Sequence, residues 1–304
     1  MDLTAVLRIA AAHGCTVETD IPMTPLTSLR VGGSADVLIG APSAEAVVAV
    51  QSACRESGVP LFVMGHGSNL CVGDKGVRGV VLRVGNGEAV LCDDGVTVVC
   101  GAGMALPKLS RFALEHGLSG LEFACGIPGS VGGAVYMNAG AYGGQISDVL
   151  VSVDIVTADG QVVTWPAAEV ELGYRHSRFM REFAVIVSAC LRLTPGNAAE
   201  MAAHMSSLLC ARREKQPLEY PSAGSFFKRP EGYFAGALIE QCGLKGFSVG
   251  GAQISEKHAG FLINRGGATA QDVCRLSAEV QARVFSVYGV QLEPEVRFVG
   301  QFIE

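Results

Sequence analysis

The sequence predicts an α+β protein of about two domains, and three observations indicate this class. The first third of the chain alternates helix-like and strand-like stretches. The segment 151–193 then alternates apolar and polar residues around a short turn, which is typical of an antiparallel sheet. The length of 304 residues corresponds to two domains of roughly 150 residues each.

In the first third, the spacing of apolar residues predicts helices separated by short strands. Residues 3–10 place their apolar side chains on one helical face. Ser43 precedes a periodic segment that runs to Glu56, so we expect it to cap a helix. Pro107 stands where the first turn of a helix tolerates proline, and Gly117 marks the end of that helix. Short strands are expected at 61–64 and 80–84.

The rest of the chain contains the predicted antiparallel sheet and two long helices. The sequence PGN at 195–197 is the best domain boundary, because a polar helix at 198–215 follows it. Thr269 and Asp272 form a capping-box pair at the start of the last helix. The sheet strands are expected at 151–156, 162–165 and 184–193.

Charge and hydropathy exclude several classes of function. The 23 basic and 29 acidic residues give a formal charge of −6, which disfavours binding of nucleic acid or anionic membranes through bulk charge. The mean hydropathy is +0.35, but the apolar runs fall short of the ~20 residues that span a bilayer. Residues 1–20 lack a signal-peptide pattern. We expect a cytoplasmic monomer or weak dimer that binds neither nucleic acid nor membrane.

The cysteines and histidines do not indicate a metal site. Ten cysteines are spread along the chain without a CxxC pair, and six histidines do not complete a ligand set. We therefore expect buried thiols, no disulfide framework and no bound metal.

Glycine is the strongest outlier, with 39 residues, nearly twice the usual frequency of ~7%. None of the glycine-rich stretches has the G-x-G-x-x-G dinucleotide fingerprint or the P-loop pattern. Concave turns of this kind expose successive N–H groups that bind a pyrophosphate without net positive charge. The stretches indicate either a large phosphorylated cofactor or tight turns between short strands. They lie at 65–70, 101–103, 126–133 and 138–144.

Three segments carry candidate catalytic groups. Ser225 stands on a glycine turn without a G-x-S-x-G elbow, so it is a candidate proton donor rather than a nucleophile. Glu293, Glu295 and Arg297 alternate and are expected on one face of a strand, unless the intervening proline disturbs the pleat. Arg175 offers a guanidinium for a carboxylate. Structural interpretations stay open for each: a turn serine, an edge-strand charge cluster and a solvated arginine.

Taken together, the motifs are more specific than any of them alone. In chain order they read TSLRVGGSAD, GHGSNL, GIPGSVGGAVYMNAGAYG, YRHSRF, KQPLEYPSAGSFFKRP, LIEQCGLKGFSVGGAQISEKHAGFLIN and LEPEVRFVG. In this order and spacing, from about residue 20 to the end, the chain resembles the UDP-N-acetylenolpyruvoylglucosamine reductases. The segment after Tyr174 is short, which is similar to the second type of this family.

The resemblance implies the fold, the cofactor and a division of the chain by ligand. We expect an FAD-binding fold of the vanillyl-alcohol oxidase kind in two subdomains, at 1–85 and 86–196, and a smaller α+β substrate-binding domain at 197–304. His66 and Leu26 depart from the family pattern. The residues expected to bind FAD are Arg30, Gly65, Gly67, Ser68, Asn69, Leu70, Gly101, Gly103, Gly126, Pro128, Gly129, Ser130, Gly132 and Gly133.

The resemblance also implies a reaction. NADPH reduces the FAD, and the reduced flavin gives hydride to the alkene carbon of UDP-N-acetylglucosamine enolpyruvate, which yields UDP-N-acetylmuramate for peptidoglycan synthesis. Ser225 matches the proton donor, and Arg175 and Glu295 match groups that stabilise charge on the substrate carboxylate. Two alternatives stay open: another FAD-dependent oxidase or dehydrogenase of this fold, and a non-catalytic flavin or nucleotide-sugar binding protein. The residues that match positions holding the UDP-sugar are Tyr142, Lys215, Arg229 and His258.

Overall fold

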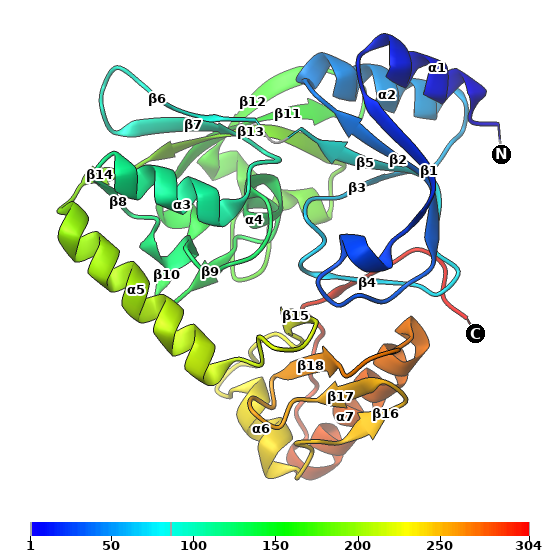
Figure 1. Cartoon of the computed structure of the whole chain (residues 1–304), viewed down its shortest axis with the longest axis vertical. Helices are drawn as coiled ribbons and strands as arrows, with labels where there is room; N and C mark the ends of the chain where they lie inside the picture. Colours follow the sequence, from blue (N-terminus) through cyan, green and yellow to red (C-terminus); the bar gives the residue numbers. More distant parts are fainter. Residues whose placement is uncertain (1, 86, 304) are drawn as a thin grey trace. The chain divides into compact units, whose positions relative to one another are not determined.

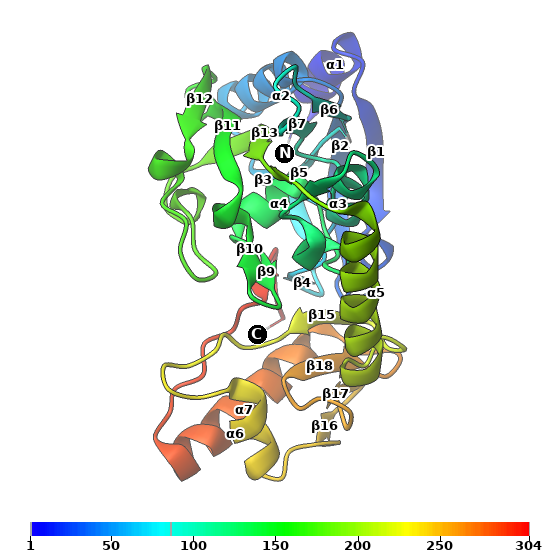
Figure 2. The ribbon, with the colours of Figure 1, turned by 90° about the vertical axis from the view of Figure 1, so that its left-hand side faces the viewer.

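The computed structural model describes residues 2–85 and 87–303. The chain divides into two compact units, each built from segments that are distant in the sequence. Figures 1 and 2 show the elements of both units from two directions. Unit 1 comprises Met1–Thr19, Val37–His66 and Gly79–Ala211, and unit 2 comprises Asp20–Asp36, Gly67–Arg78 and Arg212–Glu304.

The two units do not follow the predicted division of the chain by ligand. The predicted substrate domain begins at residue 197, whereas unit 2 takes up the chain again only at Arg212 and also includes two N-terminal segments. The two units are defined by contacts within the chain, whereas the three predicted domains are defined by the ligand each one binds. The units therefore do not test the three domains, which stay a prediction. Their boundary residues 1, 86 and 304 lie outside the described residues.

The larger sheet of unit 1 has five strands that pair antiparallel throughout. Its strands, in spatial order, are β12 (Val162–Pro166), β11 (Leu150–Thr157), β13 (Ala184–Arg192), β7 (Thr97–Gly101) and β6 (Ala89–Leu91). Val153 and Ala189 are paired across β11 and β13 and are buried in a core shared with α3 (Leu106–Glu115) and α4 (Val131–Tyr136). The predicted antiparallel sheet is therefore confirmed, and these two helices cover one of its faces.

A second sheet has four strands in the order β1 (Thr16–Pro22), β2 (Ser34–Ala41), β5 (Val77–Val84) and β3 (Leu61–Val63). In unit 1 its residues share a core with α1 (Thr4–Ala12) and α2 (Ala44–Glu56), which lie side by side in Figure 1. Val6 and Val47 bring the two helices into this core. The Ser43 Oγ accepts a hydrogen bond from the Ala46 N–H at 3.2 Å, which confirms the predicted cap of α2.

Helix α5 spans Ala198–Lys215, as the boundary signal predicts. The Asn197 Oδ1 accepts hydrogen bonds from the N–H groups of Ala199 at 2.9 Å and Glu200 at 3.3 Å, so the side chain of the PGN asparagine caps the helix. Met201 is buried, whereas most of the helix is exposed or partly exposed.

Unit 2 contains an antiparallel sheet covered by two helices. Its strands, in spatial order, are β15 (Ser222–Ser225), β18 (Phe261–Asn264), β17 (Ala252–Ile254) and β16 (Ser248–Val249). Helices α6 (Ala235–Gln241) and α7 (Ala270–Tyr288) supply Leu238 and Leu276 to the core of this unit. Leu29 and Cys71 join the same core, so the two N-terminal segments are integral parts of unit 2. The predicted capping box of Thr269 and Asp272 is confirmed at the start of α7.

The predicted strand around Glu293 and Arg297 is wrong in its bounds. Strand β19 spans only Arg297–Val299, where it pairs parallel with β4 (Leu70–Val72). Pro294 precedes it and makes only an isolated bridge with Phe227. The reason is that proline has no N–H for a ladder, so the two glutamates lie outside the strand.

Two further sequence expectations concern thiols and membranes. All ten cysteines are free; Cys54, Cys71 and Cys100 are buried, but Cys210 is exposed, which corrects the expectation that all are buried. Over the described ranges, no helix combines the length and apolar character needed to cross a bilayer.

Candidate active site

The loop 65–69 presents backbone N–H groups that the protein itself does not use. Within the described ranges 2–85 and 87–303, the N–H groups of these five residues have no hydrogen-bond partner. One of the five, Gly67, is buried. Buried N–H groups without a partner are rare. The φ angle of Gly67 is 68°, a conformation that favours glycine. The loop therefore fits a ligand with acceptor oxygens, such as the pyrophosphate of FAD.

Two other predicted cofactor segments lie in unit 1 beside Gly65 and His66: residues 126–133 and residues 101–103. A Cβ atom on Gly65 would overlap Ser130 Oγ, and one on Gly103 would overlap the carbonyl oxygens of Val84 and Gly85. The absence of side chains therefore lets the backbones approach closely. Ser130 is buried, and its Oγ accepts a hydrogen bond from the Gly133 N–H at 3.2 Å.

The remaining predicted cofactor residues lie in loops and at element ends. Gly101 ends β7, and Leu70 begins β4. His66, a departure from the family pattern, places its Nε2 3.0 Å from the Gly103 carbonyl oxygen. Arg30 has a left-handed backbone with φ of 56°. Gly126, Pro128 and Gly129 lie in the loop before α4, and Gly132 and Gly133 in its first turn.

Ser225 is exposed between a glycine and two buried phenylalanines in unit 2. The pairing of β15 with β18 contains a register shift between Ser222 and Ser225. Gly224, inside this shift, has φ of 81°. Ser225 is exposed, whereas Phe226 and Phe227 are buried. The bulge thus turns a hydroxyl outward while the next two side chains anchor the chain in the core.

Glu295 is tied by hydrogen bonds to both the serine segment and the cofactor loop. The Glu295 N–H donates to the Phe226 carbonyl oxygen at 2.8 Å. The Glu295 carbonyl oxygen accepts from Asn69 Nδ2 at 3.0 Å. Beside it, the Lys228 N–H donates to the Glu293 carbonyl oxygen at 2.8 Å. Within unit 2, the structure therefore brings together a predicted FAD loop, the predicted proton donor and the predicted acid.

Arg175 is positioned in unit 1 by two backbone carbonyl groups. Its Nη2 donates to the Gly140 carbonyl oxygen at 3.0 Å, and its Nη1 to that of Asn138 at 3.4 Å. Asn138 is itself buried, and its Nδ2 donates to the Gly173 carbonyl oxygen at 3.0 Å. These bonds fix the loop around Arg175 to the glycine-rich segment 138–144, and the φ of Arg175 is 50°.

The residues predicted to hold the UDP-sugar lie in both units. Tyr142, in unit 1, is 49% exposed. Lys215 is the last residue of α5 and is exposed. The guanidinium of Arg229 lies 3.8 Å from the ring centroid of Phe234, a cation–π contact.

His258 is a neutral donor in this arrangement. Burial lowers the pKa of His258 below its usual value, and Lys245 acts in the same direction. The Gly260 N–H donates to His258 Nδ1 at 3.0 Å. The neutral ring therefore carries its proton on Nε2.

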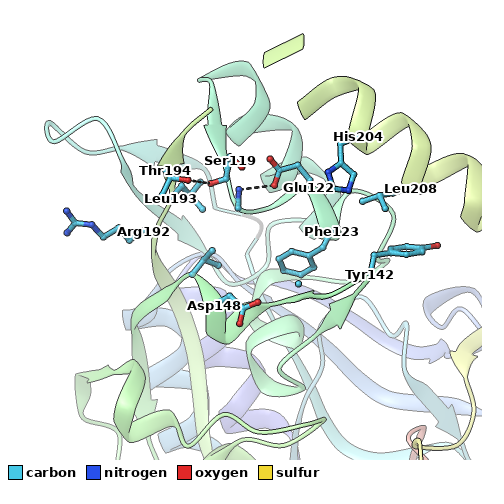
Figure 3. Close-up of a pocket in the computed structure, with 13 residues that line it drawn as sticks. Ser119, Glu122, Phe123, Tyr142, Asp148, Arg192, Leu193, Thr194, His204 and Leu208 are labelled. Atoms are coloured by element: carbon cyan, nitrogen blue, oxygen red, sulfur yellow. Dashed lines mark hydrogen bonds between the residues drawn. The ribbon is translucent and has the colours of Figure 1, made fainter. Parts of the chain in front are cut away.

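A pocket of about 370 Å³ lies in unit 1 beside Tyr142 (Figure 3). His204 and Leu208 of α5 line one side of it, and Phe123 lies on another. Burial opposes ionisation of Glu122, but hydrogen bonds from Gly120 and Ser119 and the charge of His204 together lower its pKa. Tyr142, which is predicted to bind the substrate, is among the residues that line this pocket.

Two positioning residues were not predicted from the sequence. Asn138 holds the loop of Arg175, as described above, and Asn264 donates from Nδ2 to the carbonyl oxygens of Leu29 and Arg30, both at 3.2 Å. The available signal was their position in the motifs NAGAYG and FLIN. Within the part of the chain that is described, no cluster of three or more His, Cys, Asp or Glu residues is suited to a metal ion.

Two family models match this chain. Residues 35–165 match the family model of an FAD binding domain. Residues 216–299 match that of the C-terminal domain of UDP-N-acetylenolpyruvoylglucosamine reductase.

Full-length relatives match as well. The reductase of Syntrophomonas wolfei is 48% identical over 287 residues, which cover 94% of this chain and 95% of the relative. That of Agathobacter rectalis is 49% identical over 295 residues, covering 93% and 94%. The crystal structure of the enzyme from Thermus caldophilus superposes with a TM-score of 0.81 at 36% identity, over 94% of this chain and 99% of the other.

The match to an FAD binding domain and the reductase relatives define the chain as an FAD-dependent oxidoreductase. The predicted α+β class and the FAD-binding fold are confirmed. The chain belongs to the UDP-N-acetylenolpyruvoylglucosamine reductase family.

Proposed function

We propose that the chain reduces UDP-N-acetylglucosamine enolpyruvate to UDP-N-acetylmuramate with NADPH, a step of peptidoglycan precursor synthesis in the cytoplasm. The relatives are named as reductases of the enolpyruvoyl sugar nucleotide. One observation carries the proposal: the backbone of Glu295 is bonded to Asn69 of the FAD loop and to Phe226, the neighbour of Ser225. This arrangement supports a proton donor and an acid beside the cofactor.

The cofactor segments fit FAD. FAD, when bound, carries two electrons from NADPH to the alkene of the substrate. The N–H groups of loop 65–69 are assigned to its phosphate oxygens, because they have no partner in the described chain. Gly103 and Gly132 are assigned to the close approach of neighbouring backbone segments, because a Cβ at either position would crowd them.

Three side chains are assigned to the reduction itself. Reduction of the enolpyruvyl group builds negative charge on the carbon beside its carboxylate, so that carbon must be protonated. Ser225 is assigned to give this proton; a hydroxyl is a weak acid, but the carbon is a strong base. The guanidinium of Arg175 is assigned to the substrate carboxylate. Glu295 is assigned to hold the same carboxylate through a shared proton.

The UDP-sugar residues are assigned by charge and by hydrogen-bonding capacity. Lys215 and Arg229 are cations suited to a diphosphate. Tyr142 and His258 are donors, the histidine through Nε2.

The chain is expected to act as a monomer or weak dimer, which size-exclusion chromatography with light scattering measures.

Anaerobic stopped-flow absorbance of the purified chain tests this function. We expect a yellow protein whose flavin absorbance is bleached by NADPH and restored by the enolpyruvyl substrate, with UDP-N-acetylmuramate identified by mass spectrometry. A chain that cannot be reconstituted with FAD would contradict both enzyme interpretations. A flavin that NADPH bleaches but the enolpyruvyl substrate does not restore would assign the chain to another oxidoreductase reaction.

A further inference from the structure

Thr27 carries a buried hydroxyl that no group of the described chain binds. The residue is 4% exposed, and its Oγ1 has no hydrogen-bond partner among the described residues. Burying an unpaired hydroxyl is destabilising, and valine would fill nearly the same volume without that cost. Packing therefore does not explain a threonine at this position, and the hydroxyl points to a ligand.

The turn that contains Thr27 is fixed against the FAD loop within unit 2. The Ser28 N–H donates to the Gly67 carbonyl oxygen at 3.1 Å, and the Arg30 N–H to the Thr27 carbonyl oxygen at 3.3 Å. From the other side, Asn264 holds the carbonyl oxygens of Leu29 and Arg30. The unpaired hydroxyl thus lies one residue from a contact with the loop whose N–H groups also lack partners.

Asn264 is a buried side chain whose own bonding is complete. It is 6% exposed, and its Oδ1 accepts from the N–H groups of Gly266 at 2.9 Å and Ala268 at 3.2 Å. Because its amide is saturated by the backbone, Asn264 fixes the turn and has no donor left for a ligand. Asn264 therefore positions the turn, whereas the hydroxyl of Thr27 can still donate a hydrogen bond to a ligand.

We propose that Thr27 Oγ1 donates a hydrogen bond to an acceptor oxygen of FAD, and that Asn264 positions the turn 27–30 for this contact. The proposal rests on the FAD-binding part of the proposed function. It adds to the cofactor site a residue that lies outside the range 35–165 matched by the FAD binding domain.

The isosteric variant Thr27→Val separates ligand binding from folding, because its two effects have opposite signs. In the flavin-free protein, we expect a Tm equal to that of the wild type or up to about 4 °C higher, since an unpaired buried hydroxyl is removed. For FAD, measured by quenching of flavin fluorescence, we expect a Kd raised about tenfold. Thr27→Ser should restore the Kd to within about twofold of the wild type.

Ser110→Ala is the matched control, because Ser110 is also buried but its Oγ donates to the Leu121 carbonyl oxygen at 2.7 Å. It should lower the Tm and leave the Kd for FAD unchanged. An unchanged Kd for FAD in Thr27→Val would overturn the proposal. A higher Kd accompanied by a lower Tm of the flavin-free protein would overturn it as well. A wild-type chain that binds no FAD would overturn the proposed function as well. A chain that binds FAD without turnover would contradict the proposed reaction alone.

Discussion

At the scale of single residues, backbone geometry decides which polar groups are presented. Ser225 is exposed because the bulge at Gly224 turns it away from the core that holds Phe226. Arg175 is held by two carbonyl groups on a left-handed backbone. The backbone therefore presents both side chains before any ligand binds, and the guanidinium of Arg175 is also held in direction, which favours electrostatic stabilisation without reorganisation.

His258 gives a prediction on pH dependence. Burial lowers its folded-state pKa below the unfolded value of about 6.5. The unfolded chain therefore binds the proton more readily in the window below that value. The stability that neutral His258 contributes is fully present above about pH 6.5 and is lost as the pH falls below it toward the folded-state pKa.

We expect the Tm of His258→Gln to fall less than that of the wild type when the pH is lowered from about 7.5 to about 5, as measured by differential scanning fluorimetry. His13→Gln is the control, because His13 is exposed in unit 1. Equal losses in the His258→Gln variant and the wild type would show that His258 is not responsible for the acid sensitivity.

At the scale of elements, glycine allows the close approach of the cofactor segments. A Cβ on Gly103 would overlap the carbonyl oxygens of Val84 and Gly85, which are backbone atoms and cannot move independently. We expect Gly103→Ala to lower the free energy of unfolding by about 1–3 kcal/mol and to reduce the bound flavin.

Urea unfolding and the flavin-to-protein absorbance ratio measure these effects. Gly173→Ala is the control, because a Cβ there would make an ordinary contact 3.7 Å from His176 Cβ. A Gly103→Ala protein with wild-type stability and flavin content would refute the steric argument.

Helix α7 depends on its capping box. Thr269 Oγ1 accepts from the Asp272 N–H, and Asp272 Oδ2 accepts from the Thr269 N–H, each at 3.0 Å. We expect Thr269→Ala to lower the free energy of unfolding by about 1 kcal/mol in urea, and Thr269→Ser to recover most of it. Equal stability of the alanine variant and the wild type would contradict the role of the cap.

At the scale of the whole molecule, elements set by neighbouring residues could be predicted from the sequence. Pairings between segments that are distant in the sequence could not. The start of α5 follows from the PGN turn and the Asn197 cap, which lie beside the helix in sequence. The membership of residues 20–36 in unit 2 depends on bonds such as that from Asn264 to Leu29. No local pattern specifies such a pairing across more than two hundred positions.

The site was predictable to the same degree. The glycine segments and Ser225 were identified because their local composition is unusual. Their chemical roles came from the resemblance of the whole chain and stay proposals. Asn138 was missed because its function lies in contacts with Gly173, far along the chain. The strand expected at Glu293 and Glu295 failed because one proline interrupts the ladder.

The reaction cycle of the complete chain tests the central claim, which is that Ser225 protonates the substrate after electrons have passed through FAD. The measurement compares the two half-reactions of Ser225→Ala in anaerobic stopped flow, with Ser222→Ala of the same strand as the control. If Ser225 has this role, we expect flavin reduction by NADPH at nearly the wild-type rate and reoxidation by the enolpyruvyl substrate slowed by a factor of about 10²–10⁴. Equal slowing of both half-reactions, or reoxidation at the wild-type rate, would contradict it.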